Sequence, residues 1–93
     1  MVKHIVLFNV KEGEDKARVA QIAASKLEPL AGKIAGLTHV EVRATYAGAD
    51  FALYCELESK EAMDAYAVHP LHEEAKSHFF HLLSSRTAAD YEI

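Results

Sequence analysis

Residues 2–10, with the sequence Val-Lys-His-Ile-Val-Leu-Phe-Asn-Val, decide how this chain folds. In an extended strand, successive side chains point to opposite faces of the sheet. One face of this segment carries Val2, His4, Val6, Phe8 and Val10, and the other carries Lys3, Ile5, Leu7 and Asn9. Both faces are substantially apolar, which favours burial of the strand on both sides.

A helix is predicted soon after this strand. Asp15 can cap its first turn, and the acidic residues near the start suit the helix dipole. The helix has an apolar stripe at three- and four-residue steps, made of Val19, Ile22, Ala23, Leu27 and Leu30. Pro29 should kink or loosen the helix near its end.

The second half of the chain predicts two strands, two helices and a last strand. Residues 38–46 and 51–58 alternate between apolar and polar and predict strands, the first of them near a sheet edge. Ser59 caps a short helix that should end at about Val68. Pro70 suits the start of another helix, which we expect to run to about Leu83. Its inner stripe should contain Leu71, Ala75, Phe79 and Leu82, and residues 86–93 predict the last strand.

This order, β-α-β-β-α-α-β, is that of the α+β ferredoxin-like fold with a four-stranded antiparallel sheet, and residues 1–93 make one domain. Helices cover one face of such a sheet, yet residues 2–10 favour burial of both. Because the chain has no spare element for the second face, we expect a homodimer whose sheets face each other. About 800 Å² buried per subunit would give an interface of standard size.

Composition argues against several classes of partner. Ten basic and fourteen acidic residues give a net charge of −4, and the basic residues are scattered, so no nucleic-acid interface is expected. No apolar run approaches the ~18 residues that span a bilayer, and the first residues do not resemble a signal peptide. The single cysteine, Cys55, lies among apolar neighbours with no adjacent base and should be an inert buried thiol. The expected location is therefore cytoplasmic.

A cluster of Tyr66, His69, Pro70 and His72 lies where one predicted helix ends and the next begins. Two imidazoles there can form an acid/base pair, part of a metal site or a hydrogen-bonded helix joint. Their spacing matches no strong metal motif, so neither a metal nor a cofactor is expected. In the ferredoxin-like order the last strand lies antiparallel beside the first, which places Asp90 near His4.

Three segments carry a family resemblance: residues 2–8, residues 62–72 and the closing Asp90-Tyr91. In these the chain resembles the stress-responsive A/B-barrel (Dabb) domain family of the dimeric α+β barrel superfamily. The resemblance covers nearly the whole chain. It implies a dimer in which two four-stranded sheets form a barrel-like core.

The histidine-bearing motifs are similar to those of one plant branch, the olivetolic acid cyclases. Those enzymes fold a linear polyketide by aldol condensation without a cofactor, in a pocket between sheet and helices. The resemblance implies that His72 is the general base, Asp90 its orienting partner and Tyr66 a substrate-facing hydroxyl. It also implies that His4 and His69 line the same pocket. A structural hydrogen bond between His72 and Asp90 explains the same pair equally well.

Three functions follow from these patterns. The first is a homodimer that binds a small apolar or aromatic molecule between sheet and helices. The second is a cofactor-independent cyclase, lyase or isomerase with His72 as general base, because a carboxylate fixes one imidazole tautomer and leaves the other nitrogen free to accept a proton. The third is a structural, stress-protective oligomer with a vestigial pocket.

Overall fold

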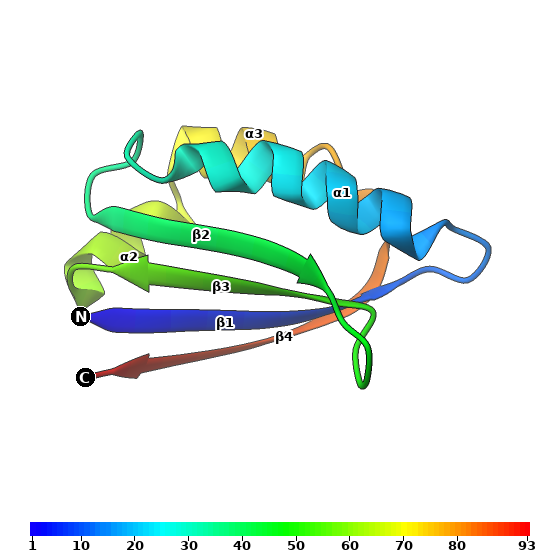
Figure 1. The fold of residues 1–93 in the computed structure, drawn as a ribbon. Coiled ribbons are helices and arrows are strands. Elements are labelled where there is room, and N and C mark those ends of the chain that lie inside the picture. The colour runs from blue at the N-terminus through cyan, green and yellow to red at the C-terminus, as the bar shows by residue number, and fades with distance from the viewer.

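The computed structural model describes all 93 residues as a layer of helices over one face of a sheet (Figure 1). The elements are β1 (Val2–Val10), α1 (Lys16–Leu27), the 3₁₀ turn η1 (Glu28–Leu30), β2 (Leu37–Ala44), β3 (Phe51–Leu57), α2 (Lys60–Ala67), α3 (Pro70–Lys76), the 3₁₀ turn η2 (Phe80–Leu82) and β4 (Leu83–Glu92). The strands form one antiparallel sheet in the order β2-β3-β1-β4. This arrangement confirms the ferredoxin-like α+β fold.

The residues predicted to cap or end the helices act as the sequence indicates. The Asp15 side chain accepts a hydrogen bond from the Arg18 backbone N–H, and the Ser59 hydroxyl accepts one from Ala62. Each bond satisfies an N–H group that has no partner inside the first turn of its helix. The α-helix ends at Leu27 and the chain tightens into the turn that contains Pro29, as a proline there requires.

The last helix is shorter than predicted. It ends at Lys76 rather than near Leu83, and β4 begins at Leu83, three residues before the predicted start. The reason is that the chain leaves helical geometry at Phe79, whose ring is fully buried and contacts the rings of Phe8 and Phe80 edge to face. Leu71, which we placed on the inner stripe, is 38% exposed, whereas Ala75 and Phe79 of that stripe are buried.

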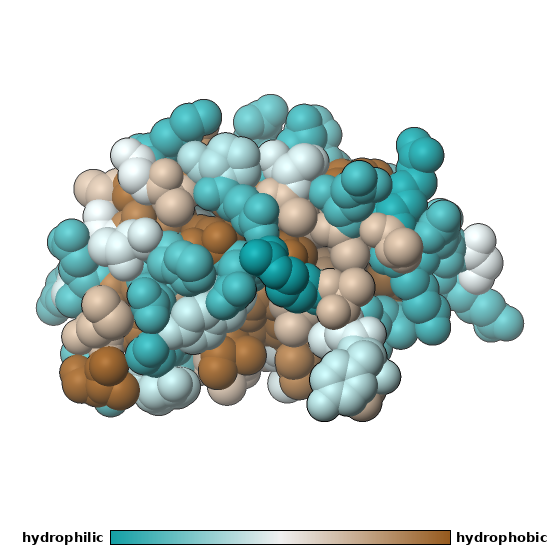
Figure 2. Space-filling view, in the orientation of Figure 1, coloured by the Kyte–Doolittle hydropathy of each residue, from teal (hydrophilic) through white to brown (hydrophobic).

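β1 lies between β3 and β4, and its two faces meet different surroundings. On the inner face all five side chains are buried: Val2, His4, Val6, Phe8 and Val10. The outer face has no helix over it, and Leu7 there is 44% exposed. In Figure 2 hydrophilic residues cover most of the helical layer, while several hydrophobic residues reach the surface along the lower margin, below the sheet.

Two close approaches fix the end of the molecule where the chain starts. Gly36, with φ of +84°, lies directly against α2: a Cβ atom there would sit 2.5 Å from the Ala62 Cβ. Only glycine combines this left-handed backbone with so short a distance. The two termini also lie side by side, and the Ile93 backbone N–H donates to the Met1 carbonyl at 2.9 Å (Figure 1). This end of the sheet carries His4 and Asp90.

Candidate functional site

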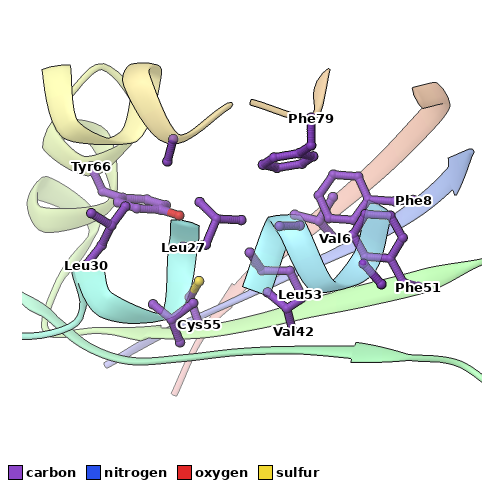
Figure 3. Packing of buried hydrophobic residues seen from close by; sticks show 14 of the residues in the cluster. Val6, Phe8, Leu27, Leu30, Val42, Phe51, Leu53, Cys55, Tyr66 and Phe79 are labelled. Carbon is purple, nitrogen blue, oxygen red and sulfur yellow. The ribbon is translucent and has the colours of Figure 1, made fainter. Parts of the chain in front are cut away.

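A cavity of about 160 Å³ lies between the inner face of the sheet and the helices. Nine of its thirteen lining residues are hydrophobic; the full set is His4, Val6, Phe8, Leu27, Leu53, Met63, Tyr66, Ala67, His72, Lys76, Phe79, Phe80 and Arg86. Figure 3 shows Tyr66 at one end of this layer and Phe79 with Phe8 at the other, above the strand residue Leu53. The site is therefore an apolar chamber with a few polar groups.

His72 is the most unusual of these polar groups. Its ring stacks on the Tyr66 ring with centroids 4.1 Å apart, and its Nδ1 atom is buried without a hydrogen-bond partner. Burial lowers the pKa of His72 to about 4, and the positive charge of Lys76 acts in the same direction. The imidazole is therefore neutral at neutral pH, and its ring forms part of the cavity wall.

Asp90 pairs with His4 rather than with His72. His4 on β1 and Asp90 on β4 are cross-strand neighbours on the inner face, and His4 Nδ1 is hydrogen-bonded to an Asp90 carboxylate oxygen. The topology thus brings Asp90 to His4, as predicted. The predicted pairing of His72 with Asp90 is not formed, because His72 belongs to α3 and packs against Tyr66 of α2.

Tyr66 is almost fully buried, and its ring lies edge-on to His4 with centroids 6.2 Å apart. Its hydroxyl interacts with the thiol of Cys55 at the floor of the core. Burial raises the pKa of Tyr66 well above its ordinary value and raises the pKa of the Cys55 thiol to about 12. Cys55 is therefore a buried, protonated thiol, as its sequence context indicates, and Tyr66 is a neutral hydroxyl on the cavity wall.

His69 lies outside the cavity. It is the N-cap of α3, and its Nδ1 atom accepts a hydrogen bond from the Leu71 backbone N–H at 3.1 Å. The expectation that His69 lines the pocket is wrong for this reason: capping the helix holds the ring at the joint between α2 and α3. Of the five residues singled out in the sequence, His4, Tyr66 and His72 line the cavity, and Asp90 reaches it through His4.

Two cationic residues that the sequence analysis did not select line the cavity as well. Lys76 Nζ lies 5.2 Å from the centroid of the Phe80 ring and 2.8 Å from a carboxylate oxygen of Glu73. The Arg86 guanidinium lies 6.0 Å from the same ring and makes no ion pair. The sequence carried a signal for Lys76, which is one helical turn after His72, whereas the place of Arg86 opposite Phe8 comes from the strand register of the folded sheet.

No three side chains of the histidine, cysteine, aspartate and glutamate types gather closely enough to hold a metal ion. No helix is both long enough and apolar enough to cross a membrane. The chemistry of the cavity is thus that of two imidazoles, a phenol and two cations beside apolar side chains. Such groups can bind a ring-bearing molecule and can exchange a proton with it.

Comparison with known proteins connects this geometry to a family. The family model for the stress responsive A/B barrel domain matches residues 2–93. A comparison with curated proteins gives no match. Solved structures are similar over nearly the whole chain, among them a dimeric protein of unknown function with a ferredoxin-like fold from Bacteroides fragilis. It is 31% identical, with a TM-score of 0.88 and with 99% of this chain and 95% of that chain covered.

Two further solved structures are dimeric ferredoxin-like proteins of unknown function. The protein from Thermobifida fusca is 28% identical, with 99% of this chain and 90% of that chain covered and a TM-score of 0.79. The protein from Jannaschia is 24% identical, with 99% and 98% covered and a TM-score of 0.84, and at that identity the likeness shows the fold alone.

Proposed function

This chain belongs to the stress responsive A/B barrel domain family, and from that premise we propose that it is a homodimer that binds a small apolar or aromatic molecule in the cavity between sheet and helices. The observation that carries the proposal is the cavity of about 160 Å³, which is mostly apolar and is lined by the rings of His4, Tyr66 and His72. A mostly apolar cavity with a few polar groups in its wall is the usual form of a small-molecule site.

The size of the cavity supports a ring-sized molecule. An engineered cavity of about 150 Å³ in another protein, lined by apolar side chains, stays dry and binds benzene. Here the ring of Tyr66 and those of Phe8, Phe79 and Phe80 offer aromatic surfaces of the kind that stack on a flat ligand. A single ring with one substituent is therefore the expected ligand size.

The homodimer part of the proposal rests on the outer face of the sheet. Leu7 is 44% exposed and Tyr91 is 49% exposed; on the same face, Ile5 lies between them and Ala52 of β3 is the cross-strand partner of Leu7. The two relatives from Bacteroides fragilis and Thermobifida fusca are described as dimeric. A second copy of this chain would cover the apolar residues that no helix covers. The cytoplasmic location expected from the sequence stays a prediction.

A second candidate function is cofactor-independent proton transfer, as in a cyclase, lyase or isomerase. The predicted version uses His72 as general base, and its neutral imidazole in the cavity wall supports that role. The pairing of Asp90 with His4 favours a different assignment of roles. His4 is then the imidazole that exchanges a proton through Nε2, and Asp90 is the group that orients it. Tyr66 would supply a hydrogen bond to the substrate.

The binding proposal is tested by filling the cavity. Ala67 lines it and Ala65 does not, although both are exposed alanines of α2, so Ala67→Leu and Ala65→Leu form a matched pair. A panel of single-ring compounds is titrated into each protein and followed by amide NMR. We expect shifts at the cavity residues that Ala67→Leu abolishes and Ala65→Leu preserves. Absence of binding to every variant would instead favour the structural, stress-protective oligomer.

A further inference from the structure

We propose that the cavity selects a single-ring carboxylate, with its ring among the apolar side chains and its charge bound by Arg86 and Lys76. This inference rests on the proposed ligand-binding function and names the ligand class for that same site. It is carried by the charges on the cavity wall, the missing partner of Arg86 and the size of the chamber.

The cavity is a positive region in an acidic protein. The chain carries a net charge of −4, yet both charged residues that line the cavity, Lys76 and Arg86, are cationic and no aspartate or glutamate lines it. Asp90 points its charge at His4 and borders a separate, open depression of about 420 Å³ that also contains Asp64 and Glu92. These acidic groups pair with neither cation; Lys76 is paired with Glu73, which does not line the cavity, and Arg86 pairs with no carboxylate of the chain.

The position of the Arg86 guanidinium allows it to bind an anion in the cavity. It is on the inner face of β4, opposite Phe8, and its guanidinium lies 6.0 Å from the Phe80 centroid. No carboxylate of the chain pairs with it, whereas Lys76 is held by Glu73 at 2.8 Å. A guanidinium can donate two parallel hydrogen bonds to a carboxylate, which no neutral ring substituent accepts in the same geometry. Arg86 therefore distinguishes an acid from its neutral analogue.

The size of the cavity and its uncharged side chains also favour a single-ring carboxylate as the ligand. A chamber of about 160 Å³ is filled by one ring, so the anionic group must be small and flat, as a carboxylate is. The Phe80 ring is near both cations, with its centroid 5.2 Å from Lys76 Nζ and 6.0 Å from the Arg86 guanidinium, so both charges lie at one wall of the cavity. The His72 ring also lines the chamber and adds a polar group to its wall.

The test compares benzoate with benzamide, which has the same ring and nearly the same shape but no charge. Both are titrated at pH 7 into the full chain by calorimetry, with amide NMR to locate the site. We expect benzoate to bind at least about tenfold more tightly, as charge-assisted hydrogen bonds contribute. In Arg86→Gln the affinity for benzoate should fall by about tenfold or more, while that for benzamide should stay within about twofold.

Two variants keep this test decisive. Arg18→Gln removes the same charge from an exposed residue of α1 outside the cavity and should leave both affinities unchanged. Arg86→Lys keeps the charge without the two-pronged geometry and should retain part of the preference for benzoate. The inference is overturned if benzamide binds as well as benzoate, or if Arg18→Gln weakens benzoate as much as Arg86→Gln does. Both of those results leave the binding function standing, whereas no binding of either compound at the cavity overturns the two together.

Discussion

The two faces of this sheet are built from alternate residues of the same strands and have opposite characters. The inner face is covered by helices and holds a buried apolar core with isolated polar groups, such as the unpartnered Nδ1 of His72. The outer face has no helix, and its polar groups are connected: Lys3 Nζ donates to the Tyr54 hydroxyl at 2.6 Å, and that hydroxyl donates to a Glu56 carboxylate oxygen at 2.6 Å.

The same strands thus contribute side chains to a buried core on one face and to an uncovered surface on the other. Burial by the chain's own helices completes the inner face, except for a chamber of ligand size. The outer face combines exposed apolar side chains with a satisfied polar network, which is the composition of a surface that a second subunit can cover. The contrast gives different expectations for substitutions on the two faces.

The largest effect is expected in the inner core. Phe51 is fully buried and stacks on Phe8 with centroids 4.6 Å apart. Phe51→Ala should lower the free energy of unfolding by about 3–5 kcal/mol, because it removes apolar contact and leaves a cavity. Urea denaturation measures the change, with Tyr46→Ala in the exposed turn as the control. A loss below about 1 kcal/mol would mean that the inner face is not the core of the protein.

The next effect is expected on the outer face. Leu7→Glu would place an unpaired carboxylate in the proposed interface and should raise the dimer dissociation constant at least about a hundredfold. Analytical ultracentrifugation measures it. Val68→Glu is a matched control, because Val68 is also an exposed apolar residue but lies beside the helices, after α2. Equal dimerisation of the two variants would contradict an interface on the outer face.

A smaller effect, on the inner face, depends on pH. The pKa of His72 is about 4 in the folded protein and 6.5 in the unfolded chain, so between these values the unfolded chain binds more protons. Stability should therefore fall as the pH drops from about 6.5 to about 4. The full difference corresponds to about 3 kcal/mol, which the partial exposure of His72 reduces to about 2 kcal/mol.

Denaturation of the wild type and His72→Phe across this range isolates that contribution. Phenylalanine keeps a ring on Tyr66 but does not titrate, so the variant should lose less stability in acid. The neighbouring titratable or charged groups, His4, Lys76 and Glu73, are the same in both proteins. Parallel curves for the two proteins would show that His72 does not carry a depressed pKa.

The smallest effect is expected in the polar network of the outer face. The Tyr54 hydroxyl is the main cause that lowers the pKa of Glu56, with Lys3 as the second. Tyr54→Phe should therefore raise the pKa of Glu56 toward its ordinary value, and carbon NMR of the carboxyl group measures it. Tyr46→Phe, in the exposed turn, should leave that pKa unchanged. An unchanged Glu56 in Tyr54→Phe would mean that the network is not formed in solution.

Local patterns predicted the elements well wherever nearby residues decide them. Asp15, Ser59 and Pro29 act within one helical turn, and the strand alternation follows from backbone geometry alone. The end of α3 was not predictable in this way. It depends on the Phe79 ring, which enters the core and contacts the rings of Phe8 and Phe80. Phe8 is far from Phe79 in the sequence, so that contact exists only in the folded protein.

The sequence by itself determined the fold class, the element order and the set of polar groups near one end of the sheet, because these depend on periodicity and on topology. Only the tertiary structure decided which polar groups meet. It places His72 on Tyr66 rather than on Asp90, it holds His69 outside the cavity as a helix cap, and it leaves Arg86 beside Phe80 without a carboxylate. Such pairings depend on side-chain directions across separate elements, which no single segment of sequence contains.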